Sequence, residues 1–273
     1  MGSDERGPSF TARVVATYRA RHQVIGDVPI FRDPFAGPLL GDDVVPLDDD
    51  NRYVVRARHF IVARARAADD LLRAAVARGV RRCVVLGAGL DTTALRHPEL
   101  DVLEIDLAET QAWKRERLAV AGLAVPPRCR LVPVDFTRDD LAAVLAREGV
   151  GPAAPAFFIW LGVSYYLDAA AVRATLAAVA ATGPDAAVVF DAYRALEELA
   201  DDARDRLLAI GARVRDVGEP FIGLFGRAEL AALAASAGLP AVDIESDADL
   251  LARYGADPGL ALGFADLVHA RAR

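Results

Sequence analysis

A glycine turn and a carboxylate nineteen residues beyond it are the residues of this chain whose spacing most clearly indicates chemistry. Gly87-Ala88-Gly89 follows the short apolar run Cys83–Leu86, which is typical of a strand buried on both faces. Glycine lets the backbone turn sharply and approach a ligand where a Cβ atom would collide. Asp106 stands directly after a second apolar run, Val102–Ile105. An adenosine-binding α/β fold places there the carboxylate that binds ribose hydroxyls. The sequence therefore predicts a nucleotide-like cofactor at this edge.

The residues after the glycines discriminate between cofactors. A dinucleotide fingerprint has a third glycine where this chain has Thr92, and Asp91 would bring negative charge toward a pyrophosphate. A phosphate-binding loop is not indicated either, because no Gly-Lys-Ser/Thr sequence follows the turn. S-adenosylmethionine (SAM) has no phosphate, and its ammonium and sulfonium groups are cationic. Charge therefore favours SAM over a nicotinamide dinucleotide.

A second carboxylate follows the third predicted strand. Asp135 and Phe136 come directly after the run Leu131–Val134. In a SAM site, an acid at this strand end can accept a hydrogen bond from the adenine amino group while the adjacent apolar side chain packs on the ring. Asp135 could instead cap a helix that begins near Arg138. In series with the glycine turn and Asp106, the cofactor interpretation is the better one.

Several segments together carry a family resemblance. The sequences LGAGLDT, EIDLAETQAWKRERL, VDF, FFIWLGVSYYLD and GEPF resemble the leucine carboxyl methyltransferase-like group of class I SAM-dependent methyltransferases, in its bacterial branch. Three N-terminal segments match in the same order: SFTARVVATYRARH, IFRDPFAGPLL and RHFIVARARAADDLLRAAVARGV. The resemblance covers nearly the whole chain. It implies a methyltransferase fold and SAM as cofactor, with S-adenosylhomocysteine (SAH) as product, but it leaves the methyl acceptor open.

The resemblance also implies a set of cofactor contacts. Arg64, in the segment VARARAADD, would bind the SAM carboxylate through its bidentate fork, with Arg58 as the alternative. Ala65 stands where the family usually has threonine, and Thr93 stands where it commonly has arginine. The residues expected to bind the cofactor are Arg64, Gly87, Ala88, Gly89, Asp91, Asp106, Leu107, Asp135, Phe136, Trp160 and Leu161.

Acceptor binding and catalysis have weaker sequence signals. His59 and Tyr18 are the candidates for a general base, since both come from elements expected to line the mouth of the site. Methyl transfer without a base remains open, because proximity can supply much of the rate and a carboxylate acceptor is already ionised at pH 7. The residues expected to contact the acceptor are His22, Ser164, Tyr165, Tyr193 and Phe221.

Composition limits the other classes of function. The net charge of −7 offers no broad basic field for nucleic acid. No run approaches the ~18 uninterrupted apolar residues of a membrane helix, and the first ten residues lack an apolar signal region. Cys83 and Cys129 are expected to be reduced thiols, and the four histidines do not have metal-ligand spacing. We expect a soluble, cytoplasmic protein without a metal, either a monomer or a homodimer.

Alternating strands and helices must position these residues. The pattern predicts an α/β fold with five parallel strands, at 83–86, 102–105, 131–134, 156–160 and 187–191, and two terminal strands at 241–244 and within 261–270. The resemblance makes this a seven-stranded class I methyltransferase sheet. Within one domain spanning 1–273, we expect an N-terminal helical cap (1–60), a SAM-binding core (80–192), a lid insertion after the fifth strand (193–226), and a C-terminal helix and hairpin (227–273). Helices are expected at 11–21, 53–78, 195–214 and 227–237, with a loop over 27–50.

The function expected from these residues is O-methylation of a small molecule. Carboxylate, enol and phenol acceptors are all compatible, plausibly in bacterial secondary metabolism. Three alternatives stay open: protein carboxyl methylation, a reaction other than methyl transfer on the SAM fold, and a non-catalytic SAM-binding protein.

Overall fold

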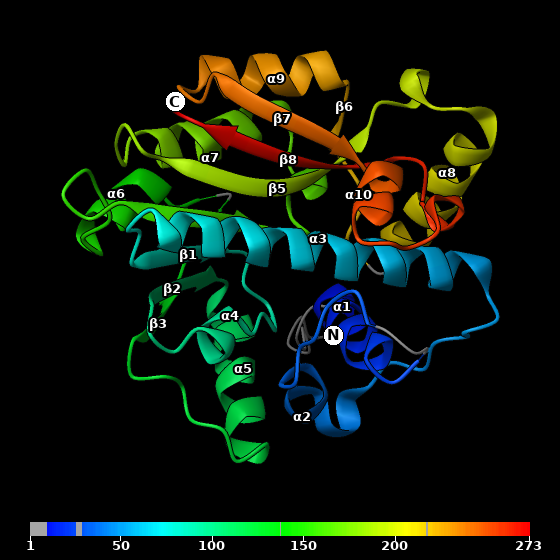
Figure 1. The fold of residues 1–273 in the computed structure, drawn as a ribbon, viewed down its shortest axis with the longest axis horizontal. Coiled ribbons are helices and arrows are strands. Elements are labelled where there is room, and N and C mark those ends of the chain that lie inside the picture. The colour runs from blue at the N-terminus through cyan, green and yellow to red at the C-terminus, as the bar shows by residue number, and fades with distance from the viewer. Residues whose placement is uncertain (1–9, 26–28, 137, 217) are drawn as a thin grey trace, which may run out of the picture.

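The computed structural model describes residues 10–25, 29–136, 138–216 and 218–273. The beginning of the expected N-terminal cap (1–9) and the first residues of the expected loop (27 and 28) lie outside the described residues. The described chain forms one mixed sheet with helices on both faces (Figure 1). The predicted α/β class is confirmed.

Parallel strands make up most of the sheet. Its order is β3-β2-β1-β4-β5-β8-β7, where neighbours are hydrogen-bonded. The first five strands are parallel, whereas β8 runs antiparallel to both β5 and β7. Their bounds are β1 (Arg82–Leu86), β2 (Asp101–Asp106), β3 (Cys129–Pro133), β4 (Ala156–Trp160), β5 (Ala187–Arg194), β7 (Ala241–Ser246) and β8 (Ala265–Arg271). All seven predicted strands are therefore present.

The predicted count of seven strands is one too few. A two-residue strand, β6 (Leu224–Phe225), pairs in parallel with Tyr193 and Arg194 of β5. Strand β8 pairs with one edge of β5 as far as Tyr193, and β4 pairs with the other edge as far as its last residue, Trp160. Strand β6 therefore pairs with β5 beyond the end of β4, on the same edge as β4. Two residues produce no alternation that a sequence pattern can reveal.

Two separate cores lie on the two faces of the sheet. Successive side chains of a strand point to opposite faces, so Phe157 and Ile159 of β4 join one core and Phe158 and Trp160 join the other. The first core packs under α3 (Arg52–Ala77), α8 (Asp201–Asp216) and α10 (Asp247–Arg253); the second packs under α6 (Leu141–Arg147), α7 (Ala169–Ala180) and α9 (Arg227–Ser236). In Figure 1 the long helix α3 runs across the whole view.

Helix α3 forms where its sequence signals predict it. Asn51 accepts a hydrogen bond from the Tyr53 backbone amide and thereby caps the first turn. The helix has a buried stripe that includes Ala63, Ala67 and Leu72. It ends before Gly79, whose φ of +103° is unfavourable for other residues.

The N-terminal helices pack beside the glycine turn. Helix α1 (Phe10–His22) and helix α2 (Ala36–Leu40) form a third core in which Ala16 and Leu39 contact Leu90, next to the turn. The loop predicted for 27–50 therefore contains a helix. Its five residues are too few for a periodic pattern, and burial against α1 and α5 (Ala108–Val120) stabilises it. No helix within the described residues combines the length and apolar character needed to cross a bilayer.

Candidate functional site

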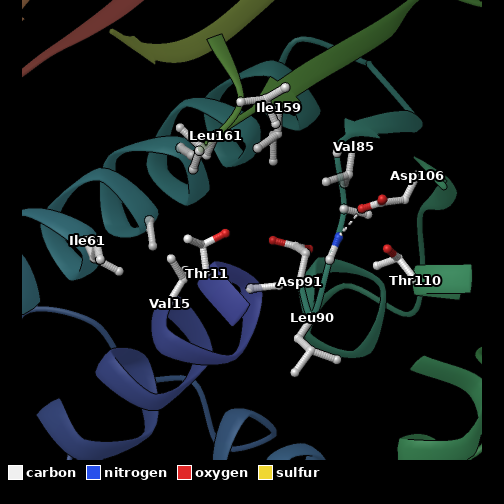
Figure 2. Close-up of a pocket in the computed structure, with 18 of the residues that line it drawn as sticks. Thr11, Val15, Ile61, Val85, Leu90, Asp91, Asp106, Thr110, Ile159 and Leu161 are labelled. Carbon is white, nitrogen blue, oxygen red and sulfur yellow. Dashed lines mark hydrogen bonds between the residues drawn. The ribbon is translucent and has the colours of Figure 1, made fainter. Parts of the chain in front are cut away.

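The functional residues gather where the strand order reverses. Strand β1 lies between β2 and β4, so the connections leaving β1 and β4 diverge and open a crevice at their carboxyl ends. A cavity of about 380 Å³ occupies this position. In Figure 2, Ile159 and Leu161 lie above the cavity, Thr11 and Val15 of α1 lie below it, and Asp106 lies at the right.

Most of the residues predicted to bind a cofactor line this cavity. They come from the ends of β1 to β4 and from α3, which are far apart in sequence. The predicted cofactor residues on its wall are Arg64, Gly87, Ala88, Gly89, Asp91, Asp106, Leu107, Asp135, Phe136 and Leu161, and the predicted acceptor residue Tyr165 also lines it.

The glycine turn closes one end of the cavity. Gly87 has φ +65° and donates its amide hydrogen to Ile105 O at 2.8 Å, which ties the turn to β2. A Cβ atom on Gly87 would lie 2.4 Å from Val163 Cγ2, closer than side chains pack. Both the backbone conformation and the space therefore require glycine here.

Asp106 spans the turn from the end of β2. Its Oδ2 accepts a hydrogen bond from Gly89 N at 2.6 Å, drawn as a dashed line in Figure 2, and its Oδ1 accepts one from Leu107 N at 2.7 Å. Burial raises the pKa of the Asp106 carboxyl, and the two backbone hydrogen bonds oppose that shift. The Thr110 side chain also hydrogen-bonds to this carboxyl, so three of its roughly four acceptor sites are used and about one is left for a ligand hydroxyl.

Asp91 is the carboxylate between the turn and α4 (Thr93–Arg96). Its Oδ1 accepts a hydrogen bond at 2.6 Å from the backbone amide of Thr93, the first residue of α4. Burial alone would raise its pKa, but the charges of Arg96, Lys114 and Arg19 outweigh burial and lower it. Asp91 is therefore ionised at neutral pH and still lines the cavity.

Asp135 does not begin the next helix. Helix α6 starts at Leu141, and the side chain of Asp140 caps it by accepting from Ala143 N at 3.1 Å. The alternative expectation, a helix from about Arg138 capped by Asp135, is therefore corrected. Asp135 and Phe136 instead line the cavity beside Asp106.

The charge of the cavity wall suits a cation. Five carboxylates and three guanidiniums line it, and each guanidinium is already ion-paired: Arg19 with Asp33, Arg64 with Asp191, and Arg96 with Asp69. A pyrophosphate would therefore meet an excess of carboxylates on this wall. A ligand with cationic groups is favoured electrostatically.

Arg64 is buried in the wall opposite Asp106. Its side chain is 4% exposed, and its Nη1 donates to Asp191 Oδ2. Burial alone would lower the pKa of Arg64, but Asp191 and the neighbouring hydroxyls of Tyr165 and Tyr193 outweigh burial and raise it. Arg58, the alternative, is instead paired with Asp49 at 2.8 Å and is not among the described residues of the cavity wall.

Trp160 does not reach the cavity. Strand alternation places Ile159 on the cavity side, so the fully buried Trp160 indole lies on the other face and packs against Phe190 at 5.5 Å between ring centroids. The expectation that Trp160 borders the cofactor is therefore corrected, because successive side chains of β4 point to opposite faces of the sheet. Leu161, the next residue, does line the cavity.

The predicted bases His59 and Tyr18 and the predicted acceptor contact His22 lie away from the cavity wall. His22 and His59 meet edge to face with ring centroids 5.8 Å apart, between α1 and α3. His22 Nε2 accepts from Ile30 N at 2.9 Å, and burial lowers the pKa of His22 to about 4. Burial also lowers the pKa of His59 and raises that of Tyr18 to about 12. None of the three is among the described residues that line the cavity.

The remaining predicted acceptor residues form a layer behind Tyr165. Tyr193 stacks on Tyr165 with ring centroids 4.0 Å apart, and Phe221 packs edge-on to both rings. Ser164 Oγ donates to the Asp191 backbone carbonyl. These three residues support the cavity wall through Tyr165 rather than lining it.

Comparison with known proteins places the chain in a family. The family sequence model described as leucine carboxyl methyltransferase matches residues 12–180, well over half of the chain. The chain belongs to the leucine carboxyl methyltransferase family. A family relative from Mycobacterium marinum, a candidate SAM-dependent methyltransferase, is 33% identical over an alignment that covers 69% of each chain.

Two other relatives agree with this assignment, and a solved structure has the same fold. YktD of Bacillus subtilis is 32% identical over 65% of this chain, and a Frankia alni relative is 38% identical over 62%; both are named as candidate SAM-dependent methyltransferases. The chain spans only about three fifths of the length of either, 60% and 62%. The crystal structure of a DUF574 family protein from Streptomyces avermitilis superposes with a TM-score of 0.63 at 17% identity, covering 97% of this chain and 98% of that one, which shows the fold.

Sequence reasoning missed a group of residues on this family member's wall, Thr11, Ala12 and Val15 of α1, which line the cavity only because the helix packs against the turn. It also missed Asp191, a fully buried acid inside the apolar strand β5, which lies behind the wall and pairs with Arg64. An acid within an apolar run is a signal that could have found it, because a buried charge needs a partner.

Proposed function

We propose that this family member is a SAM-dependent methyltransferase that methylates an oxygen of a small organic acceptor. The observation that carries the proposal is the Asp106 carboxylate, which Gly89 N and Leu107 N hold at the cavity wall beside the glycine turn. A carboxylate at the end of the second strand is the group that binds ribose hydroxyls in this class of fold.

The described residues fit SAM along the length of the cavity. Asp106 would take the ribose, and Asp135 with Phe136 would frame the adenine. Asp91 provides a carboxylate for the ammonium group, and Arg64 provides a guanidinium for the carboxylate. When bound, the cofactor supplies a methyl group that is activated because it is attached to a sulfonium sulfur, which departs as a neutral thioether. The excess of carboxylates on the wall favours such a cationic ligand.

The protein contributes to the reaction by holding the cofactor and the acceptor close together and by enclosing them in the cavity. None of the predicted bases lines the cavity among the described residues, so proximity and exclusion of water are the means that this wall offers. A carboxylate acceptor suits such a site without a base because it is already ionised at pH 7, whereas an enol or a phenol acceptor would have to lose a proton.

A contact across the cavity favours a small acceptor over a protein. Thr11 of α1 donates its hydroxyl to Glu219 Oε2 at 2.7 Å, and both residues line the cavity. This bond joins the N-terminal helix to the segment that follows α8. A site closed in this way suits an enclosed small molecule. A cyclisation or other reaction on the same fold, and SAM binding without turnover, remain the alternatives.

Calorimetric titration with SAH tests the cofactor. Asp106→Asn should weaken binding by roughly 10- to 150-fold, because charge-assisted hydrogen bonds are worth about 1.5–3 kcal/mol each. Asp101→Asn is the matched control, since Asp101 begins the same strand at its far end. Binding of SAH to Asp106→Asn with wild-type affinity would falsify the assignment.

Incubation with methyl-labelled SAM tests the reaction. Panels of carboxylic acids, phenols and enols are offered as acceptors, and label transfer to one of these classes is the expected result. Binding of SAH without label transfer to any small acceptor favours the alternatives. Label transfer to protein carboxyl groups alone contradicts the small-molecule proposal.

A further inference from the structure

Two carboxylates hold the cavity in the same way, one at each end. Asp106 in β2 accepts the amide hydrogen of Gly89, in the turn that leaves the neighbouring strand β1. Asp191 in β5 accepts the amide hydrogen of Gly162 at 2.7 Å, in the turn that leaves its neighbouring strand β4. Both glycines have left-handed backbone, with φ +48° and +80°. The sequence suggested a role only for the first carboxylate.

Asp191 differs from Asp106 in that its second oxygen is committed to an arginine. Asp191 Oδ2 accepts from Arg64 Nη1, while Oδ1 accepts from Gly162 N. Asp191 is fully buried and the Arg64 side chain is 4% exposed, so water does not screen the pair. A guanidinium on a long flexible side chain needs such a partner to be held in one orientation.

Arg64 and Asp191 lie where the far end of an extended ligand would reach if its ribose were bound at Asp106. Strands β2 and β5 are separated by β1 and β4, so Asp106 and Asp191 lie three strand spacings apart, roughly 14 Å across the sheet. A ligand whose ribose lies on Asp106 reaches Arg64 only through a substituent that crosses the ends of β1 and β4. The amino-acid part of SAM is such a substituent, and its carboxylate is the group that a guanidinium binds.

We propose that Asp191 is a positioning residue: it orients Arg64 and the Gly162 turn so that this end of the cavity binds the amino-acid part of the cofactor. The inference rests on the proposed function. Asp191 lies behind the wall and acts through Arg64, which lines the cavity. The opposite role for Asp191 would be to neutralise the charge of Arg64, which would weaken the attraction of Arg64 for an anionic group of the ligand. The two roles predict opposite effects when the charge of Asp191 is removed.

Two ligands separate positioning from a general structural role. SAH carries the adenosine and the amino-acid part, whereas 5′-methylthioadenosine keeps the adenosine part and the sulfur, as a methylthio group, but lacks the amino-acid part. In Asp191→Asn, calorimetry should show SAH binding weakened about tenfold or more, as expected for losing a charge-assisted arrangement, while 5′-methylthioadenosine binds as to wild type. In Asp106→Asn both ligands should weaken together, because both carry the ribose.

The other outcomes overturn the proposal. Unchanged or tighter SAH binding in Asp191→Asn means that Asp191 only neutralises Arg64, and equal loss of both ligands means that it only supports the fold. If thermal melting shows that Asp191→Asn does not fold, Asp191→Glu takes its place, since it keeps the charge but displaces the guanidinium by one methylene. The same selective loss of SAH is then expected, and its absence overturns the proposal. Wild-type protein that binds neither ligand defeats the proposed function instead.

Discussion

Replacing Gly87 with alanine is a demanding test of the glycine turn, because the chain contains a matched glycine elsewhere. Gly87 has φ +65° and Gly122, after α5, has φ +68°. An added Cβ atom would lie 2.4 Å from Val163 Cγ2 at Gly87, whereas at Gly122 it meets no atom within 4 Å. The two substitutions therefore share the backbone strain and differ in the collision.

The expected magnitudes follow from this difference. Left-handed backbone costs a non-glycine residue about 1–2 kcal/mol, which should be the whole effect of Gly122→Ala on the free energy of unfolding. Forcing an extra methyl group against Val163 adds about 1–3 kcal/mol. Gly87→Ala should therefore cost roughly 2–5 kcal/mol in total. Because Val163 also lines the cavity, Gly87→Ala alone should weaken SAH binding.

Urea unfolding of both variants, followed by SAH titration, measures these effects. Adding Val163→Ala to Gly87→Ala removes the colliding methyl groups, so the difference between the two glycine variants should shrink. Equal destabilisation by Gly87→Ala and Gly122→Ala would refute the reasoning, as would loss of SAH binding in Gly122→Ala.

Three further predictions concern the core, an ionic cluster and pH. Trp160→Phe should leave SAH affinity unchanged while costing about 1–3 kcal/mol of unfolding free energy in urea; weaker SAH binding by the folded variant contradicts this. Asp69→Asn should cost about 2–4 kcal/mol at pH 7, because Asp69 accepts from Arg73, Arg96 and His97. These partners lower the pKa of Asp69 although burial opposes them, so its contribution should be fully present above the unfolded pKa of about 4 and should be lost progressively as the pH falls from there toward the lower folded pKa; a difference that does not decline in acid would count against the cluster. Burial raises the pKa of Asp106, so calorimetry at several pH values should show SAH affinity falling as acid protonates this group, at higher pH than for an ordinary carboxyl, and Asp106→Asn should lack this dependence.

The sequence by itself determined the parts of the site that local chemistry controls. Glycine at 87 and 89 is recognisable because left-handed backbone has few other occupants. Asp106 and Asp135 are recognisable because each follows an apolar run short enough to be a strand. Parallel strands end at one edge of the sheet, so these residues had to come together once the strands were correct. All of them line one cavity.

Only the tertiary structure decided which side chains reach that cavity from other elements. Ile159 and Trp160 are adjacent in β4, so their side chains point to opposite faces of the sheet: Ile159 lines the cavity and Trp160 lies in the opposite core. In a strand buried on both faces, no local sequence pattern tells which side chains face the cavity. The resemblance drew attention to the histidines of α1 and α3, but packing turned His22 and His59 toward each other. Arg64 and Asp191 are 127 residues apart, and their pairing depends on how α3 lies across β5. Such contacts arise from long-range packing, whose register a linear pattern of residue types does not contain.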